Sequence, residues 1–268
     1  MMHQCQGIHA DPPKCNTIVC IIPYISGKKR FFQRFSLFFR KMYVTIQITA
    51  EYAAHLTERG GSVMSSRHTI SYTCPACEQT FSLTQWVNIS PNDAPELRKH
   101  VMTGDLFHHI CPYCGKHMMI AYNCLYQDSS KRFAVSLHVN RSEAAVTPLL
   151  PGYQMRLERT LPSFVERIRI LDAGLDDMVF ELYRMVVLAQ VKKQHPDRAV
   201  SSLRFDAVEG QDLFLQVSQS EQIRLPLSSY QNLADRVKRS GFHPKVSGYL
   251  HIHGKWVQQS GILDVLKK

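Results

Sequence analysis

Four of the eight cysteines form two pairs whose spacing is typical of metal ligands. Cys74-Pro-Ala-Cys77 is followed, after 33 residues, by Cys111-Pro-Tyr-Cys114. Each pair can present two thiolates from one tight turn, and two such turns together give the tetrahedral S4 site that zinc prefers. We therefore expect one structural Zn²⁺ ion per chain, bound by Cys74, Cys77, Cys111 and Cys114.

Two other chemistries fit the same residues less well. A redox Cys-x-x-Cys motif normally stands alone near a βαβ unit, and structural disulfides belong to secreted proteins, whereas no secretory signal is visible here. Four cysteines also close the coordination shell of the metal, which leaves no position for substrate or water. The pattern therefore favours a structural metal over catalysis at the metal.

The histidines near the second pair and a fifth cysteine offer weaker alternatives. One of His108, His109 and His117 could replace a cysteine ligand, although with four thiolates present we expect ordinary strand residues. Cys124 is expected to be a small buried hydrophobe.

The C-terminal half holds further polar residues without a recognisable catalytic motif. His251 and His253 share one face of an expected strand, with His243 nearby, but a third metal ligand at sensible spacing is lacking. Asp172, Asp176 and Asp177 could form an acidic site. We favour the simpler interpretation that Asp176 and Asp177 open a helix, where carboxylates interact well with the helix dipole.

The segments around the cysteine pairs predict β-hairpins. Residues 69–73 and 81–89 flank the first pair, and 106–110 and 118–122 flank the second, in rough alternation of polar and apolar side chains. Between them, Asn92 can cap a short helix over 94–103 that ends at Gly104. A further strand is expected over 133–139. This pattern predicts two hairpin knuckles with a helical insertion.

The rest of the chain predicts helices and a small sheet. Helices are expected over 161–172 and 175–193, and strands over 203–208, 213–218 and 222–227. Ser228 or Ser229 can cap a helix that runs to Arg239 and is closed by Gly241. A last strand is expected over 249–257. The predicted fold class is α+β, namely a zinc-ribbon-like β-hairpin domain with a helical insertion, followed by helices and a small antiparallel sheet.

Three regions are expected along the chain. Residues 1–63 differ in composition from the rest, and 28–43 combine basic and aromatic residues in a pattern that suits a membrane-surface helix. A purine-rich coding run for residues 58–61 would resemble a bacterial ribosome-binding site ahead of Met64. We therefore interpret 1–63 as a non-native or disordered extension, 64–148 as the zinc ribbon and 149–268 as an α+β C-terminal region.

The charge distribution and hydropathy of the chain disfavour nucleic acids and membranes as partners. The chain of 268 residues carries a formal net charge of +10, but residues 64–140 hold six Lys or Arg against five Asp or Glu. Nucleic-acid binding relies on basic faces that neutralise phosphates, so the ribbon disfavours it. No apolar run reaches the ~18 residues of a membrane span, and we expect a soluble, cytoplasmic protein.

The paired motifs resemble those of the prokaryotic CpXC domain family. The resemblance runs from Tyr72 to about Leu188 and is carried by Cys74-Pro75-Ala76-Cys77 and Cys111-Pro112-Tyr113-Cys114-Gly115-Lys116. Supporting segments are 95–97, 104–107, 125–128, 172–177 and Glu181. The resemblance implies a zinc-binding module with the same four cysteine ligands and no catalytic residue.

The sequence predicts a non-enzymatic zinc-binding module for interaction with an unidentified protein partner or for assembly. One alternative is nucleic-acid binding through the ribbon or through the basic helix 228–239, which ends in Arg236-Val-Lys238-Arg239. Another is an enzyme whose site lies in the C-terminal half.

Overall fold

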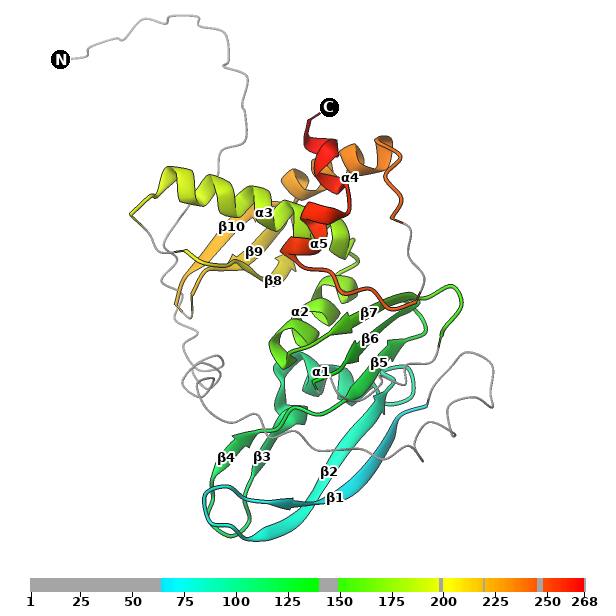
Figure 1. Cartoon of the computed structure of the whole chain (residues 1–268), viewed down its shortest axis with the longest axis vertical. Coiled ribbons are helices and arrows are strands. Elements are labelled where there is room, and N and C mark those ends of the chain that lie inside the picture. Colours follow the sequence, from blue (N-terminus) through cyan, green and yellow to red (C-terminus); the bar gives the residue numbers. More distant parts are fainter. Residues whose placement is uncertain (1–63, 140–148, 198–199, 219, 245–247, 268) are drawn as a thin grey trace, which may run out of the picture.

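The computed structural model describes residues 64–139, 149–197, 200–218, 220–244 and 248–267. The interpretation of residues 1–63 lies outside the described residues. The fold is mixed α+β, as the sequence predicts, and its elements form two connected halves (Figure 1).

The first half is built on a five-stranded sheet with the strand order β1-β2-β5-β6-β7. β1 and β2 pair antiparallel, as do β5 and β6, whereas β2 pairs parallel with β5 and β6 with β7. Helix α2 packs against β6 and β7. The bounds are β1 Ser66–Thr73, β2 Thr80–Ile89, β5 Cys124–Asp128, β6 Phe133–Leu137, β7 Gln154–Glu158 and α2 Leu161–Asp172.

The long connection from β2 to β5 carries the expected helical insertion and second hairpin. It contains α1 Pro95–Thr103, the 3₁₀ turn Asp105–Phe107, β3 His108–Ile110 and β4 His117–Met119. Gly104 ends α1 in the left-handed conformation, with φ of 79°. The expected cap was wrong: Ala94 is the N-cap residue, and the Asn92 side chain instead accepts a hydrogen bond from the Ser129 amide, 2.8 Å away.

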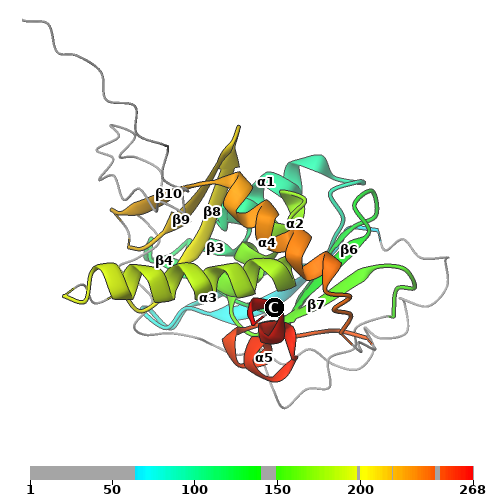
Figure 2. The same ribbon diagram turned by 90° about the horizontal axis from the view of Figure 1, so that it is seen from above.

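The second half pairs a three-stranded antiparallel sheet, ordered β10-β9-β8, with helices. β9 and β10 alternate buried side chains with partly or fully exposed ones, so each buries one face. Figure 2 shows α3 and α4 crossing beside this sheet, and α3 also contacts α5. The bounds are α3 Asp177–Gln194, β8 Arg204–Glu209, β9 Asp212–Gln216, β10 Gln222–Pro226, α4 Leu227–Arg239, α5 Gly254–Gln259 and the 3₁₀ turn Ile262–Leu266.

The strand expected over 249–257 was wrong. Only Leu250 forms a bridge, to Arg156 of β7, and the chain then enters α5. The side chain of His253 accepts from the amides of Lys255 and Trp256, so it caps this helix. The alternation of polar and apolar residues stops at the point where this cap forms.

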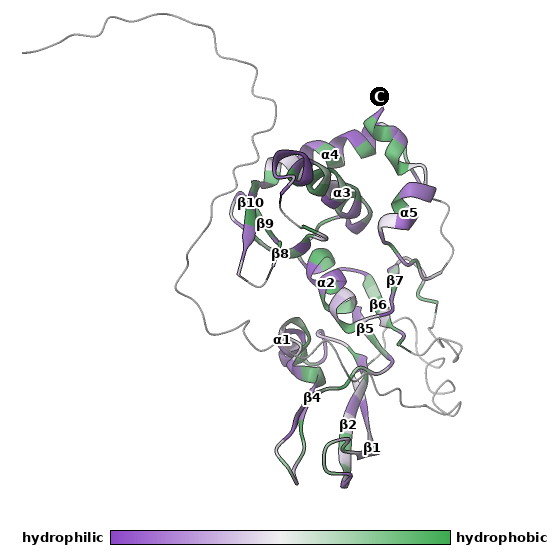
Figure 3. Ribbon diagram, turned by 60° about the vertical axis from the view of Figure 1, so that its left-hand side comes forward, coloured by the Kyte–Doolittle hydropathy of each residue, from purple (hydrophilic) through white to green (hydrophobic). Residues whose placement is uncertain are grey.

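Each half has one large hydrophobic core, and α2 contributes to both; a small third cluster contains Leu125, Ala134 and Leu150. Buried residues from Tyr72 to Leu171 form the first core, and those from Ile170 to Val265 form the second. Hydrophobic and hydrophilic residues alternate along α2 and α4, as expected of helices that bury one side (Figure 3). The domain boundary expected after residue 148 stays a prediction; β7 and α2, which follow it, pair and pack with the preceding strands.

Candidate metal centre

The four predicted cysteine ligands meet at one point. Cys74 and Cys77 lie in the turn between β1 and β2, and Cys111 and Cys114 lie in the turn between β3 and β4. Their Sγ atoms all lie within 4.8 Å of one another. Among the residues that the structure describes, this is the one group of three or more His, Cys, Asp or Glu side chains placed to hold a metal ion.

The two turns have the same backbone hydrogen bonds. The Cys74 amide donates to the Gln79 carbonyl, and the Glu78 amide donates to the Cys74 carbonyl. In the second turn, Cys111 and Gly115 donate in the same way to Lys116 and Cys111. The residue after the second cysteine is left-handed in both, with φ of 59° at Glu78 and 69° at Gly115. Glycine adopts this conformation without strain, whereas glutamate does not.

The distances between the sulfurs fit a shared metal ion. Cys74 Sγ lies 3.7 Å from Cys114 Sγ, and Cys77 Sγ lies 3.7 Å from Cys111 Sγ. Tetrahedral Zn–S bonds of about 2.3 Å place the ligand sulfurs about 3.8 Å apart. A disulfide would require about 2.05 Å, and the cysteines are free. The donor set therefore fits a closed, four-coordinate thiolate site.

The neighbouring cysteines shift the pKa values of the Cys74 and Cys77 thiols. Burial raises the pKa of the Cys74 thiol, but hydrogen bonds from the Ala76 and Cys77 amides and from neighbouring thiols outweigh it and lower this pKa to about 7. The amide of Gln79 lowers the pKa of Cys77, yet burial and the three other cysteines raise it to about 12. The Cys74 thiol thus ionises easily, whereas ionisation of the Cys77 thiol, which would place a second negative charge beside it, is disfavoured. A bound cation removes this conflict, because thiolates become the favoured form beside a metal.

Aromatic residues beside the two turns pack into the same hydrophobic core. Tyr72 and Phe81 stand opposite each other on β1 and β2, with their ring centroids 5.6 Å apart. At the base of the second hairpin, Phe107 is fully buried against Phe164 of α2, and its carbonyl accepts from the Ile120 amide. The turns that carry the cysteines are thus held at the end of the molecule away from α3 (Figure 1).

The histidines near the second pair lie outside the group of four sulfurs. His117 Nδ1 and His108 Nε2 are 3.1 Å apart across the β3–β4 hairpin. His109 points to the other face of the hairpin, where burial, with a smaller contribution from His108, lowers its pKa to about 4. None of the three is part of the four-sulfur group.

Cys124 is buried in β5, as expected of a small hydrophobe. Burial raises the pKa of its thiol, which keeps it protonated and unreactive. Cys5, Cys15 and Cys20 lie outside the described residues.

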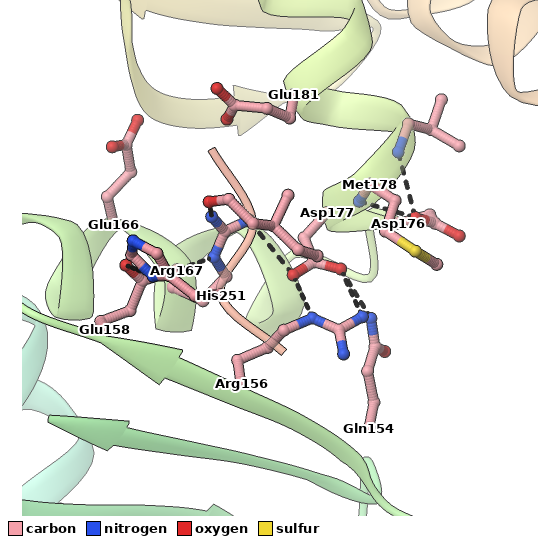
Figure 4. Close-up of polar contacts among 12 residues, drawn as sticks. Gln154, Arg156, Glu158, Glu166, Arg167, Asp176, Asp177, Met178, Glu181 and His251 are labelled. Atoms are coloured by element: carbon pink, nitrogen blue, oxygen red, sulfur yellow. Dashed lines mark hydrogen bonds and ion pairs between the residues drawn. The ribbon is translucent and has the colours of Figure 1, made fainter. Parts of the chain in front are cut away.

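The three aspartates considered as an acidic site have separate partners. Asp172 forms ion pairs with Arg98 and Lys131. Asp176 is the N-cap of α3, where its side chain accepts from the amides of Met178 and Val179. Asp177 points the other way, into the interior (Figure 4). The expectation that Asp176 and Asp177 open a helix is confirmed, since Asp176 is the N-cap and Asp177 the first residue of α3, whereas the buried ion pairs of Asp177 were missed.

Asp177 is the centre of a buried ion cluster between β7, α2 and α3. Arg156 of β7 donates to both of its carboxylate oxygens, at 2.6 and 2.9 Å, and Arg167 of α2 donates at 3.1 Å. Arg167 also pairs with Glu158 and donates to the Ile252 carbonyl, which ties the C-terminal segment to α2. Burial would raise the pKa of Asp177, but the two guanidinium groups outweigh it and hold this pKa below its usual value.

A sequence signal for this cluster exists. Arg156 shares one face of β7 with Gln154 and Glu158, so the pattern of that strand gives no signal. Arg167, however, falls at a core position of its helix, three residues after Phe164 and one before Ile168. A charged residue at an apolar position of a periodic pattern indicates a buried partner.

His251 and His253 of the C-terminal segment form hydrogen bonds with backbone groups. His251 Nδ1 donates to the Leu157 carbonyl, 2.7 Å away, and His253 caps α5. The second metal site considered for them is not among the groups of potential ligands in the part of the chain that the structure describes.

Comparison with known proteins gives one match. Residues 72–184 match the family model described as CpXC protein. Neither the curated proteins nor the solved structures yield a match. The matched range starts in β1 and ends in α3, so it includes both cysteine pairs and the core of the buried ion cluster. The resemblance drawn from the two Cys-Pro-x-Cys motifs is thereby confirmed.

Proposed function

Because residues 72–184 form a CpXC domain, we propose that this chain is a non-enzymatic zinc-binding module that serves protein interaction or assembly. The observation that carries the proposal is the convergence of four cysteine sulfurs at distances that suit one tetrahedral ion. Zinc is the metal for which such closed thiolate shells are most typical, and it would act structurally by holding the two hairpins together.

The metal is needed because the hairpin ends bury little apolar surface. β3 and β4 have three residues each, and the turn residues other than Cys74, Cys111 and half-buried Cys77 and Lys116 are exposed. Such small elements are stabilised by a metal more than by a core. Zinc bound to thiolates contributes on the order of 10 kcal/mol in peptide systems.

The surface beside the metal centre supports a protein partner. Ile110 is 53% exposed and Tyr113, at the tip of the second turn, is 62% exposed. Exposed aromatic and apolar residues of this kind are typical of the centre of a protein interface. The alternative of nucleic-acid binding has weaker support, since the ribbon is almost neutral and Arg236 of α4 donates to the Val265 carbonyl.

Metal analysis tests the structural part of this proposal. We expect one zinc per chain in protein purified under reducing conditions. Cys111→Ser should lose the metal and disorder both turns, because one ligand of four is removed. Cys124→Ser is the matched control, since Cys124 lies away from the ligand group, and it should retain one zinc. Protein without metal, or with iron in place of zinc, would refute the assignment.

Affinity capture from the native host, with nuclease treatment, tests the interaction part. Tyr113→Ala should keep the zinc but lose the captured protein, because the substitution removes exposed surface and no ligand. Leu266→Ala, an exposed residue in the second half, is the control. Partners that disappear on nuclease treatment would instead support the nucleic-acid alternative.

A further inference from the structure

The four sulfurs of the metal centre are unequally accessible. Cys74 and Cys111, the first residue of each pair, are 0% and 1% exposed. Cys77 is half-buried, whereas Cys114 is exposed. A reagent from solution therefore reaches Cys114 first, and a thiolate that binds a metal is deprotonated and nucleophilic.

The two sulfur–sulfur contacts of 3.7 Å both join one turn to the other. One pairs Cys74 with Cys114, and the other pairs Cys77 with Cys111. The exposed sulfur of Cys114 therefore lies in contact with a buried cysteine of the opposite turn. A disulfide between the turns also leaves in place the backbone hydrogen bonds that close each turn.

We propose that the cysteine centre is an oxidation site for hydroperoxides, in which Cys114 reacts first and Cys74 then forms a disulfide with it across the two turns. The inference rests on the proposed zinc site and adds to it a reaction, an order of attack and a pattern of pairing.

The reaction balances as a two-electron oxidation for each disulfide. The Cys114 thiolate attacks the peroxide, the O–O bond breaks, and the products are a sulfenic acid and a hydroxide or alkoxide that takes up a proton. The Cys74 thiolate then attacks the Cys114 sulfur, the S–S bond forms, and the S–O bond breaks to release hydroxide, which is protonated to water.

Loss of two thiolates leaves the metal with two protein ligands, and Zn²⁺ departs as the hydrated ion. A second peroxide can oxidise Cys77 and Cys111 in the same way. The product is a metal-free form in which covalent bonds replace the zinc between the two hairpins.

Trypsin separates the outcomes because of where the basic residues lie. Residues 68–98 contain Cys74 and Cys77 without an internal Lys or Arg, and residues 100–116 likewise contain Cys111 and Cys114. A disulfide between the turns links these two peptides, whereas a disulfide within a turn leaves two separate peptides, each lighter by two hydrogens.

The experiment treats the zinc-loaded full chain with increasing hydrogen peroxide and follows zinc release with a chromogenic chelator and disulfides by peptide mass spectrometry. We expect the linked pair 68–98 and 100–116, with fragmentation that assigns Cys74–Cys114 first, and loss of one zinc per chain as this link forms. Limiting N-ethylmaleimide should label Cys114 ahead of the other three ligands, and Cys124 should stay unlabelled.

Separate peptides with internal disulfides, or a first label on Cys74 or Cys111, would overturn the inference. Retention of zinc after the link has formed would do so as well. These results differ from failure of the proposed function, which would appear earlier as a reduced protein that contains no zinc.

Discussion

Replacement of Asp177 by Asn should strongly destabilise the fold, because Asp177 neutralises two buried guanidinium groups. Its carboxylate is fully buried and accepts hydrogen bonds from Arg156, Arg167 and Gln154 at distances between 2.6 and 3.1 Å. The substitution keeps the size of the side chain but removes the charge. Within the cluster, Arg167 then keeps one acidic partner, Glu158, whereas Arg156 loses the carboxylate with which it pairs.

The expected cost is about 3–5 kcal/mol, which is typical when one partner of a buried ion pair is removed and the other charge stays buried. Asp176→Asn provides a matched control. Asp176 is exposed, and asparagine caps helices about as well as aspartate, so the same chemical change one residue away should cost less than about 0.5 kcal/mol.

Urea unfolding followed by tryptophan fluorescence measures the difference. The two tryptophans report on different halves, since Trp86 lies in β2 and Trp256 in α5. Both signals should move to lower urea in Asp177→Asn, because the cluster joins β7, α2 and the C-terminal segment. Equal stability of the two Asn variants would refute the assignment of Asp177 as a structural ion centre.

The pH dependence of this difference has a defined sign. The folded-state pKa of Asp177 is depressed, so its contribution is present above the unfolded pKa of about 3.9 and is lost as pH falls through the folded value. The stability gap between wild type and Asp177→Asn should therefore stay constant from pH 7 to 5 and shrink only below about pH 4.

Three further substitutions, with Tyr113→Phe as a control, test the local geometry, each by urea or thermal unfolding of the zinc-loaded protein. Gly115→Ala should lower stability by about 1 kcal/mol, since Gly115 has a φ of 69° with no heavy atom near an added Cβ, and the cost is backbone strain alone. Glu78→Gly at the equivalent position should be neutral or stabilising by up to about 1 kcal/mol, and a clear loss would show that the Glu78 side chain has a role of its own. Tyr230→Phe should cost about 1–2 kcal/mol, because the buried hydroxyl donates to the Asp176 carbonyl and accepts from its amide. Tyr113→Phe, whose hydroxyl is exposed, should change nothing measurable.

The cluster of four cysteines could be predicted from the sequence because each pair is specified locally. Each Cys-Pro-x-Cys turn is specified by residues next to one another, and the flanking strands are recognisable from their alternation. Only the meeting of the two turns depends on contacts between distant parts of the sequence, and two Cys-x-x-Cys turns together supply the four ligands of a closed thiolate site. The expected helices and the small sheet followed from the same kind of local periodicity.

The errors arose where a tertiary contact competes with a local preference. Asn92 is a good helix cap, but its side chain accepts from Ser129, 37 residues later, so the helix starts at Pro95 without a side-chain cap. Tyr249, His251 and His253 alternate like strand residues, yet only Leu250 finds a strand partner. Arg167 reaches the Ile252 carbonyl across 85 residues, a contact that no local pattern encodes.

The four-cysteine centre and the buried ion cluster lie in different environments within the structure. In the part of the chain that the structure describes, no helix is long and apolar enough to cross a membrane. The hairpin ends project from the first sheet and bury little, and there four thiolates can gain most from a metal ion (Figure 1). In the interior beside α2, two guanidinium groups pair with two carboxylates, those of Arg156, Arg167, Glu158 and Asp177. Because the four-cysteine centre and the ion cluster share no residue, loss of the metal should disorder the two turns while α2, α3 and the small sheet remain folded.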